Sequence, residues 1–219
     1  MKNKVLNTKK WVAVLAVVVS TGFAHAQTDY QSQLQKSIVQ MEQSKNAQEL
    51  APVTKAFAKI AEENPNQWLP YYYASYNSVM EGFRGNYTDK TKLETLANQA
   101  EEWMKKAEAL SPENAEIYIL KARINGLRMM INPQKYYATD GKSYGENLAK
   151  AKKLSPDNPR ITLLEAEMVY YTPKEHGGSK ELGLKLFEKA LKHFETQEAE
   201  QKLLPHWGKK EAQYFLSLK

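Results

Sequence analysis

Two stretches of the chain, "AEALSPENAEIYILKA" (Ala107–Ala122) and "AKKLSPDNPRITLLEA" (Ala151–Ala166), align without a gap and are identical at half of their positions. A looser and slightly shorter copy, "AEENPNQWLPYYYA", covers residues 61–74. Two unrelated helices would not agree this often. The chain therefore contains an internal repeat, which is typical of a repeat architecture.

The spacing of the repeat indicates the fold class. The matching alanines, Ala74, Ala122 and Ala166, are 48 and then 44 residues apart. The composition favours helix, with many Ala, Leu, Lys, Glu and Gln residues and few Gly. A helical unit of this length predicts an α-solenoid, in which each helix pair buries its apolar face on the next pair.

Each copy of the repeat predicts the end of one helix and the start of another. A Ser-Pro or Asn-Pro pair breaks the first helix. We expect Asn64, Asn114 and Asn158 to cap helix ends, and Pro159 suits a first helical turn. The small alanine that follows lets a partner helix approach closely.

Apolar residues at three- and four-residue steps predict helices along most of the chain. The clearest stripes run over Leu93–Leu110 and Leu184–Phe194. Further helices are predicted over Tyr30–Gln43, Ala47–Glu62 and Trp68–Glu81. No segment shows the alternation of a half-buried strand.

The repeat resembles the tetratricopeptide repeat (TPR), whose unit is two antiparallel helices. Tyr118 and Ala122 match the large and small residues of its first helix, and Leu182–Phe194 resembles its second helix, with Phe187 and Ala190 in place. The resemblance implies an all-α, right-handed TPR-like solenoid of about four helix pairs plus a terminal helix over Pro205–Leu216. It also implies a single helical-repeat domain over residues 27–219.

The units are longer than the usual TPR unit. Their extra residues fall where each first helix should turn into its second, over Arg84–Lys92, Asn132–Gly145 and Thr172–Lys180. We therefore expect three longer connections on one side of the solenoid.

The TPR resemblance also implies a binding surface, because the first helices of that family line a concave groove for peptides. Aligning the three alanines places polar and aromatic side chains there. The predicted partner-binding residues are Tyr71, Ser78, Arg123, Glu167 and Tyr170, with Ser75, Ile119 and Leu163 beside them.

The leading functional hypothesis is an exported, non-catalytic scaffold that binds a protein or peptide through this concave face. The alternative is a transport-associated protein that binds or passes a small ligand together with a substrate-binding partner. It rests on resemblance to the TPR-like periplasmic component of TRAP transporters. Apolar walls at Met129–Ile131 would suit such a ligand.

The N-terminus predicts export. Four lysines precede a short apolar run, Trp11–Val19, and "AHA" (Ala24–Ala26) provides small residues for a signal peptidase. We expect residues 1–26 to be a signal peptide cleaved before Gln27, which predicts a periplasmic or secreted protein. The apolar run is too short for a confident membrane span, so no transmembrane segment is expected after cleavage.

Charge and cysteine content exclude several classes. The formal charge of +6 includes four lysines and no acids from residues 1–26, so the remaining chain has a net charge of +2. Nucleic acid is therefore not an expected partner. The chain has no cysteine, which excludes disulfides and thiolate metal sites.

The stretch "TPKEHGGSK" (Thr172–Lys180) could be either a phosphate-binding loop or a turn. No buried strand precedes it and no Gly-Lys-Ser/Thr ends it, so we interpret it as a turn. Gly177 and Gly178 are predicted to adopt positive φ and Ser179 to cap the next helix. The role of His176 stays open.

No stretch predicts catalysis. "GKSYG" (Gly141–Gly145) fits the letters of a hydrolase elbow around Ser143, but it lies between two predicted helices, where the elbow needs a strand. The mature chain has three scattered histidines and no pair at metal-binding spacing. We therefore expect no enzyme, no cofactor and no metal.

Overall fold

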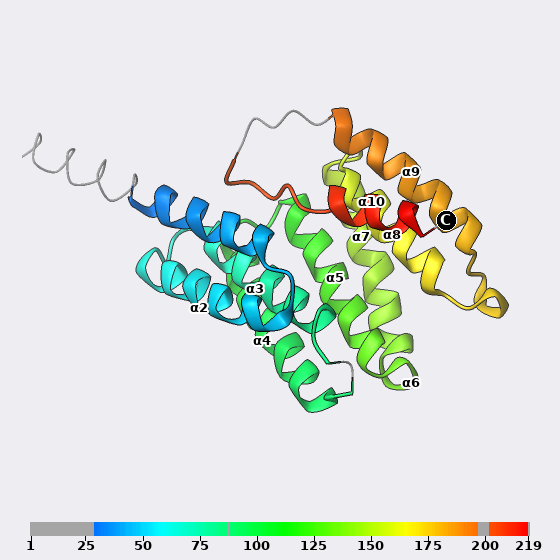
Figure 1. The fold of residues 1–219 in the computed structure, drawn as a ribbon, viewed down its shortest axis with the longest axis horizontal. Coiled ribbons are helices and arrows are strands. Elements are labelled where there is room, and N and C mark those ends of the chain that lie inside the picture. Colours follow the sequence, from blue (N-terminus) through cyan, green and yellow to red (C-terminus); the bar gives the residue numbers. More distant parts are fainter. Residues whose placement is uncertain (1–28, 87, 197–201, 219) are drawn as a thin grey trace, which may run out of the picture.

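The computed structural model describes residues 29–86, 88–196 and 202–218. Within these ranges every regular element is a helix, which confirms the predicted all-α class (Figure 1). The predicted signal peptide lies outside the described residues. A first helix covers residues 29–43. The later elements are α2 (Ala47–Glu63), α3 (Trp68–Phe83), α4 (Lys90–Leu110), α5 (Ala115–Ile131), α6 (Pro133–Tyr136), η1 (Tyr137–Gly141), α7 (Lys142–Leu154), α8 (Pro159–Tyr171), η2 (Lys174–His176), α9 (Lys180–Thr196) and α10 (Lys209–Ser217).

The helices follow one another as pairs. Residues 29–43 precede α2, α3 packs on α4, α5 on α7 and α8 on α9, and α10 follows as the terminal helix. Contacts between α4 and α5 and between α7 and α8 join neighbouring pairs. This order confirms the prediction of about four helix pairs and a terminal helix. No helix among the described residues has the length and apolarity needed to cross a membrane.

The capping asparagines explain why the helices begin where they do. Asn114 accepts a hydrogen bond from the backbone N–H of Glu116 at 3.0 Å, and Asn158 accepts one from Arg160 at 3.1 Å. Both confirm the predicted N-caps. Asn64 instead caps the C-terminal end of α2, where its side-chain amide donates to the carbonyl of Ile60 at 2.9 Å.

The repeated alanines are buried between helices. Ala74, Ala122 and Ala166 have no exposed surface. Next to the first of them, the Ser75 hydroxyl on α3 donates to the carbonyl of Ala100 on α4 at 2.7 Å. A side chain this short reaches another helix's backbone only where the two helices lie close together, so α3 and α4 approach closely beside Ala74.

The longer connections lie where the sequence predicts them, between α3 and α4, α5 and α7, and α8 and α9. The second contains η1, a turn of π-helix over Tyr137–Gly141. Such turns are rare and often occur at functional sites. This connection is therefore a candidate part of a functional site.

The glycine turn between α8 and α9 is partly as predicted. Gly177 has φ of 88°, and Ser179 accepts a hydrogen bond from the N–H of Leu182 at 3.1 Å, so both predictions are confirmed. The prediction for Gly178 was wrong, because its φ is not positive. Glycine is required there for space, since an added Cβ would lie 1.7 Å from the carbonyl oxygen of Thr172.

Replacing Gly178 with alanine is expected to lower the free energy of unfolding by about 2–3 kcal/mol, because the backbone has to move to accept the methyl group. Gly145→Ala is the matched control. No atom lies within 4 Å of a Cβ there, and the residue is inside α7, so this change should be neutral or slightly stabilising. Urea denaturation measures both. Equal effects at the two positions would contradict the steric explanation.

Candidate functional site

The predicted partner-binding residues lie mostly inside the molecule. Tyr71, Ser78 and Arg123 are 8%, 0% and 4% exposed, and Glu167 and Tyr170 are partly buried. These side chains therefore do not form an open surface in this structure. The face formed by α3, α5 and α8, here called the first-helix face, is covered by the chain's own C-terminal segment, residues 202–217 (Figure 1).

Trp207 is the main anchor of the C-terminal segment, and it is 8% exposed. Its indole N–H donates to the Tyr72 hydroxyl at 2.8 Å, and its ring stacks on Tyr76 with centroids 4.8 Å apart. The guanidinium of Arg123 lies 4.8 Å from the indole centroid. The segment is therefore held by two tyrosines of α3 and one arginine of α5.

Arg123 also joins three helices through two carboxylates. It contacts Glu167 of α8 at 3.3 Å and Glu211 of α10 at 2.8 Å. Burial and the nearby Glu211 raise the pKa of Glu167 to about 7, although Arg123 acts to lower it. Burial alone would lower the pKa of Arg123, but the two carboxylates raise it overall, so the guanidinium stays charged.

The structure brings together two of the five predicted residues, Arg123 and Glu167. Tyr71 packs instead against Trp103, with ring centroids 6.0 Å apart, and Ser78 donates to the carbonyl of Ala74 within its own helix. Tyr170 packs on Phe187 and Phe215, where α8, α9 and α10 meet. Whether any of the five binds a partner stays a prediction.

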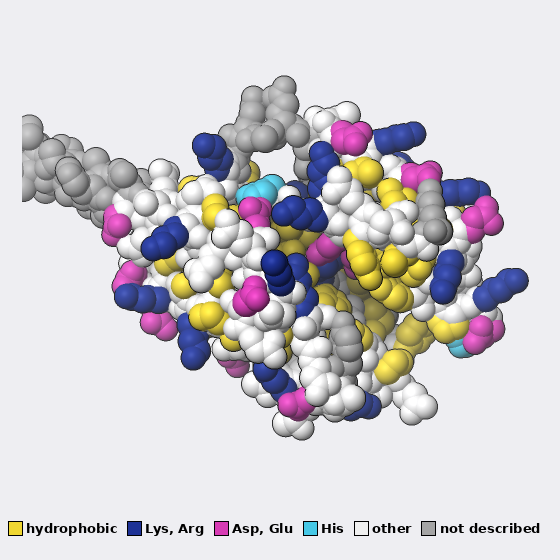
Figure 2. Space-filling model, in the orientation of Figure 1, with side chains coloured by type: hydrophobic (Ala, Val, Ile, Leu, Met, Phe, Trp, Pro, Cys, Tyr) yellow, Lys and Arg dark blue, Asp and Glu magenta, His cyan; other side chains and the backbone are white. Residues whose placement is uncertain are grey.

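The outer side of the C-terminal helices keeps some apolar surface. Figure 2 shows apolar side chains gathered around α8 and α10, with charged groups around them. In this part of the chain, Tyr171 of α8 and Tyr214 of α10 are 69% and 60% exposed, and Leu218, directly after α10, is 52% exposed. On the opposite side of α10, Ala212 and Phe215 are buried. Burial of α10 is therefore one-sided, as an amphipathic surface helix requires.

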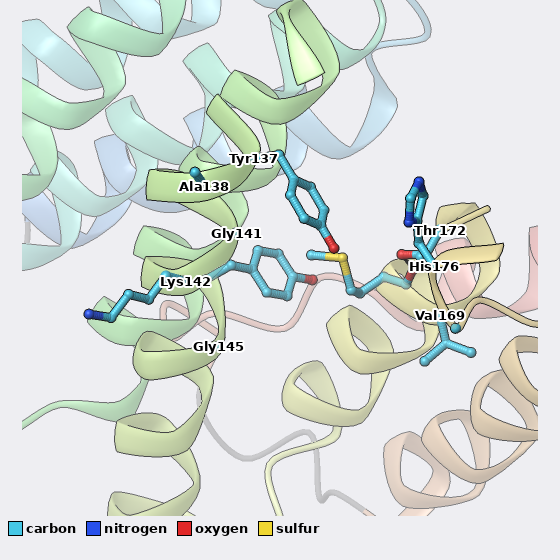
Figure 3. A pocket seen from close by; sticks show the side chains of 11 residues that line it. Tyr137, Ala138, Gly141, Lys142, Gly145, Val169, Thr172 and His176 are labelled. Carbon is cyan, nitrogen blue, oxygen red and sulfur yellow. Dashed lines mark hydrogen bonds between the residues drawn. The ribbon is translucent and has the colours of Figure 1, made fainter. Parts of the chain in front are cut away.

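A second candidate site is a cleft of 520 Å³ between the η1–α7 wall and the α8–η2 wall (Figure 3). We call it the apolar cleft, because its lining is mostly apolar. Its size lies in the range of about 300–1,000 Å³ that is common for small-molecule sites. It is lined by Tyr137, Ala138, Gly141, Lys142, Tyr144, Gly145, Met168, Val169, Thr172, His176 and Gly177.

Three side chains in the apolar cleft can coordinate iron: His176, Met168 and Tyr137. In Figure 3, Tyr137 and His176 face each other from opposite walls, and Lys142 extends away from them. Tyr144 is committed to packing, because its hydroxyl donates to the carbonyl of Leu164 at 2.6 Å. Burial also raises the pKa of Tyr144 well above its ordinary value, so that phenol stays neutral.

The apolar cleft brings together two stretches that resemble catalytic or phosphate-binding motifs in sequence but lack the strands that such motifs require. Gly141–Gly145 contributes one wall and Thr172–Gly177 the other. Ser143 of the first stretch lines a different, polar cleft of 730 Å³, away from His176. Sequence reasoning did not identify Tyr137 or Met168 as site residues. Tyr137 stands out only in the structure, where it begins the π-turn of the long connection.

A bare metal ion has no evident site in the part of the chain that the structure describes. No group of three or more His, Asp or Glu side chains in those residues is arranged to hold one. A metal that is already bound within an organic ligand needs only one or two side chains from the protein. The apolar cleft offers enough side chains for such a ligand.

No protein-family model matches the chain, and a search of curated proteins gives no match. Among solved structures, the HusA haemophore from Porphyromonas gingivalis is similar, with a TM-score of 0.75 and 27% sequence identity. The likeness covers 86% of this chain and 92% of that chain. The two proteins therefore share a helical fold over most of their lengths. The TPR resemblance stays a likeness of helix order, and no comparison links the chain to TRAP transporters.

Proposed function

We propose that this chain is an exported, non-catalytic protein that binds haem or a related porphyrin in the apolar cleft. The similarity to a haemophore, a protein that carries haem, supports the ligand class. The observation in this chain that supports it most is the lining of the cleft, which combines His176, Met168 and Tyr137 with apolar walls.

This lining suits a flat, apolar ring with a metal at its centre. Imidazole, thioether and phenolate are all known protein ligands of haem iron. The apolar walls would exclude water from the faces of the ring. A non-catalytic role is supported by Ser143 and His176 lining different clefts.

Titration of the mature chain with haemin tests the proposal. We expect saturable binding with a shifted Soret band, and about tenfold weaker binding by His176→Ala, which corresponds to about 1.4 kcal/mol. Binding of iron-free protoporphyrin should not change, because an axial ligand acts only on the metal. His193→Ala, on α9 outside the cleft, is the control.

Absence of saturable haemin binding by the unmodified chain would overturn this proposal. If His193→Ala weakened binding as much as His176→Ala, the cleft assignment would be wrong even though haem binds. The small-ligand alternative from the sequence then stays open for other ligands.

A second candidate function is binding of a protein or peptide on the first-helix face. One observation favours it: this face already holds a peptide segment, the chain's own residues 202–217. The residues that hold this segment include Arg123 and Tyr170 of the predicted groove. An external peptide would have to compete with the C-terminal segment for the same contacts.

A further inference from the structure

The first-helix face recognises the C-terminal segment through three separate chemical features. A backbone carbonyl, that of Leu203, accepts a hydrogen bond from the Tyr73 hydroxyl at 2.9 Å. An aromatic ring, that of Trp207, stacks on α3, and a carboxylate, that of Glu211, pairs with Arg123 of α5. Backbone, aromatic and acidic contacts together are the contacts of a peptide-binding groove.

The contacts around Trp207 make a slot for an aromatic side chain. Tyr76 offers a ring face, the Tyr72 hydroxyl accepts from the indole N–H, and two guanidinium groups lie near the ring. Those of Arg123 and Arg160 are 4.8 and 5.7 Å from the indole centroid. Buried cations beside an aromatic ring favour an electron-rich ring over an aliphatic side chain.

The same arginines have donors that the C-terminal segment leaves unused. Arg123 and Arg160 are each 4% exposed, yet Nε of the first and Nη1 of the second have no hydrogen-bond partner. Buried donors are nearly always bonded in native proteins. Arg123 already pairs with the carboxylate of Glu211 at 2.8 Å, so the face suits a ligand that carries an acid at this place.

Gly208 sets the spacing between the aromatic ring and the acid. Its φ is 108°, in the left-handed region, and it joins Trp207 directly to α10. An added Cβ would lie 2.8 Å from Leu163 and 2.7 Å from Phe194. Glu211 then falls in the first turn of α10, above Arg123. The recognised pattern is an aromatic residue, a glycine, two variable residues and an acid.

We propose that the first-helix face is a binding site for a peptide segment of this pattern, and that residues 202–217 occupy it as a tethered competitor. The inference rests on the second candidate function and not on haem binding. Because the competitor is part of the chain, its effective concentration is high, and an external segment binds well only when the tether's contacts are weakened.

A labelled peptide of residues 202–217, titrated into full mature chains, tests the inference. Trp207→Ala in the protein removes the main anchor of the tether, so we expect it to bind the peptide at least about tenfold more tightly than the unmodified chain does. Trp103→Ala, whose ring contacts Tyr71 away from this segment, is the control and should not differ from the unmodified chain. Circular dichroism and thermal denaturation verify that each protein is folded, and Glu211→Gln is a milder opening variant if Trp207→Ala does not fold.

The peptide itself decides the chemistry. Peptides with Trp207→Ala or Glu211→Gln should each bind the opened protein about tenfold less tightly than the parent peptide. If they bind equally well, the proposed pattern is wrong although the face binds peptides. If no peptide binds any folded opened variant, the second candidate function fails as well. Haemin titration of the same variants should give unchanged affinity, which keeps the two sites separate.

Discussion

Replacing Glu116 with alanine is expected to lower the free energy of unfolding by about 3–5 kcal/mol, because it leaves a buried cation without its counter-charge. Glu116 accepts hydrogen bonds from Arg160 at 3.0 Å, from Asn158 at 2.6 Å and from the Tyr72 hydroxyl at 3.3 Å. Burial alone would lower the pKa of Arg160, but Glu116 raises it overall. The arginine would therefore stay charged in the variant and would have to be hydrated or exposed.

Glu108→Ala is the matched control for this prediction. Glu108 also pairs with a cation, Lys121 at 2.9 Å, but both side chains are about a third exposed, at 29% and 33%. Its loss should cost at most about 1 kcal/mol. Urea denaturation compares the two variants, and equal costs would contradict a buried role for Glu116. The double change Glu116→Leu with Arg160→Met should recover much of the stability, because no charge is then left unpaired.

The repeat was predicted from the sequence. The ion pairs that join its units were not predicted, although the alignment of the copies indicates them. Glu116 and Arg160 occupy the same position in the two aligned copies, and Arg123 and Glu167 both directly follow the copies. Both pairs are salt bridges in the structure. Equivalent residues of neighbouring first helices lie side by side in a solenoid, so opposite charges at equivalent positions predict contact.

The path of the C-terminal segment could not be predicted in the same way. "PHWGKKEAQYFL" (Pro205–Leu216) has the pattern of a first helix, and its helix does form over Lys209–Ser217. Periodicity indicates which side of a helix is apolar, but it does not indicate which other helices that side meets. Trp207, just before the helix, contacts α3 more than a hundred residues earlier in the chain.

The apolar cleft escaped prediction for a related reason. Its walls come from two connections between helices, where no periodic pattern constrains the backbone. His176 was visible as an isolated side chain, but its position opposite Tyr137 depends on the π-turn of η1 and on the left-handed Gly177. Local sequence indicates that each turn exists, whereas only the packed helices bring the two turns together.

Replacing Arg123 with methionine is expected to destabilise the protein by about 3–5 kcal/mol at about pH 8 and by clearly less at about pH 5.5. Without the guanidinium, Glu167 and Glu211 lose their shared cation. Already in the unmodified chain, burial and Glu211 raise the pKa of Glu167 to about 7, above its ordinary value of 4.5. Removal of Arg123, which acts to lower that pKa, must raise it further.

The sign of the pH effect follows from this shift. A carboxyl with a higher pKa in the folded chain makes the folded chain bind more protons than the unfolded chain, so stability rises as the pH falls from above 7 towards 4.5. The increase in stability should be larger in Arg123→Met than in the unmodified chain. The difference in stability between the two proteins therefore becomes smaller as the pH falls. Tyr76 and Tyr144, the other titratable groups near the pair, stay neutral over this range because burial raises the pKa of each well above its ordinary value.

Arg128→Met separates this effect from a general loss of charge on α5. Arg128 pairs with Glu101 at 2.7 Å, but that carboxylate is 44% exposed, so the variant should lose about 1 kcal/mol or less at either pH. Thermal denaturation at both pH values measures the stability differences. If the stability difference between Arg123→Met and the unmodified chain stays constant or grows at the lower pH, then Glu167 and Glu211 are not the unpaired charges that destabilise the variant.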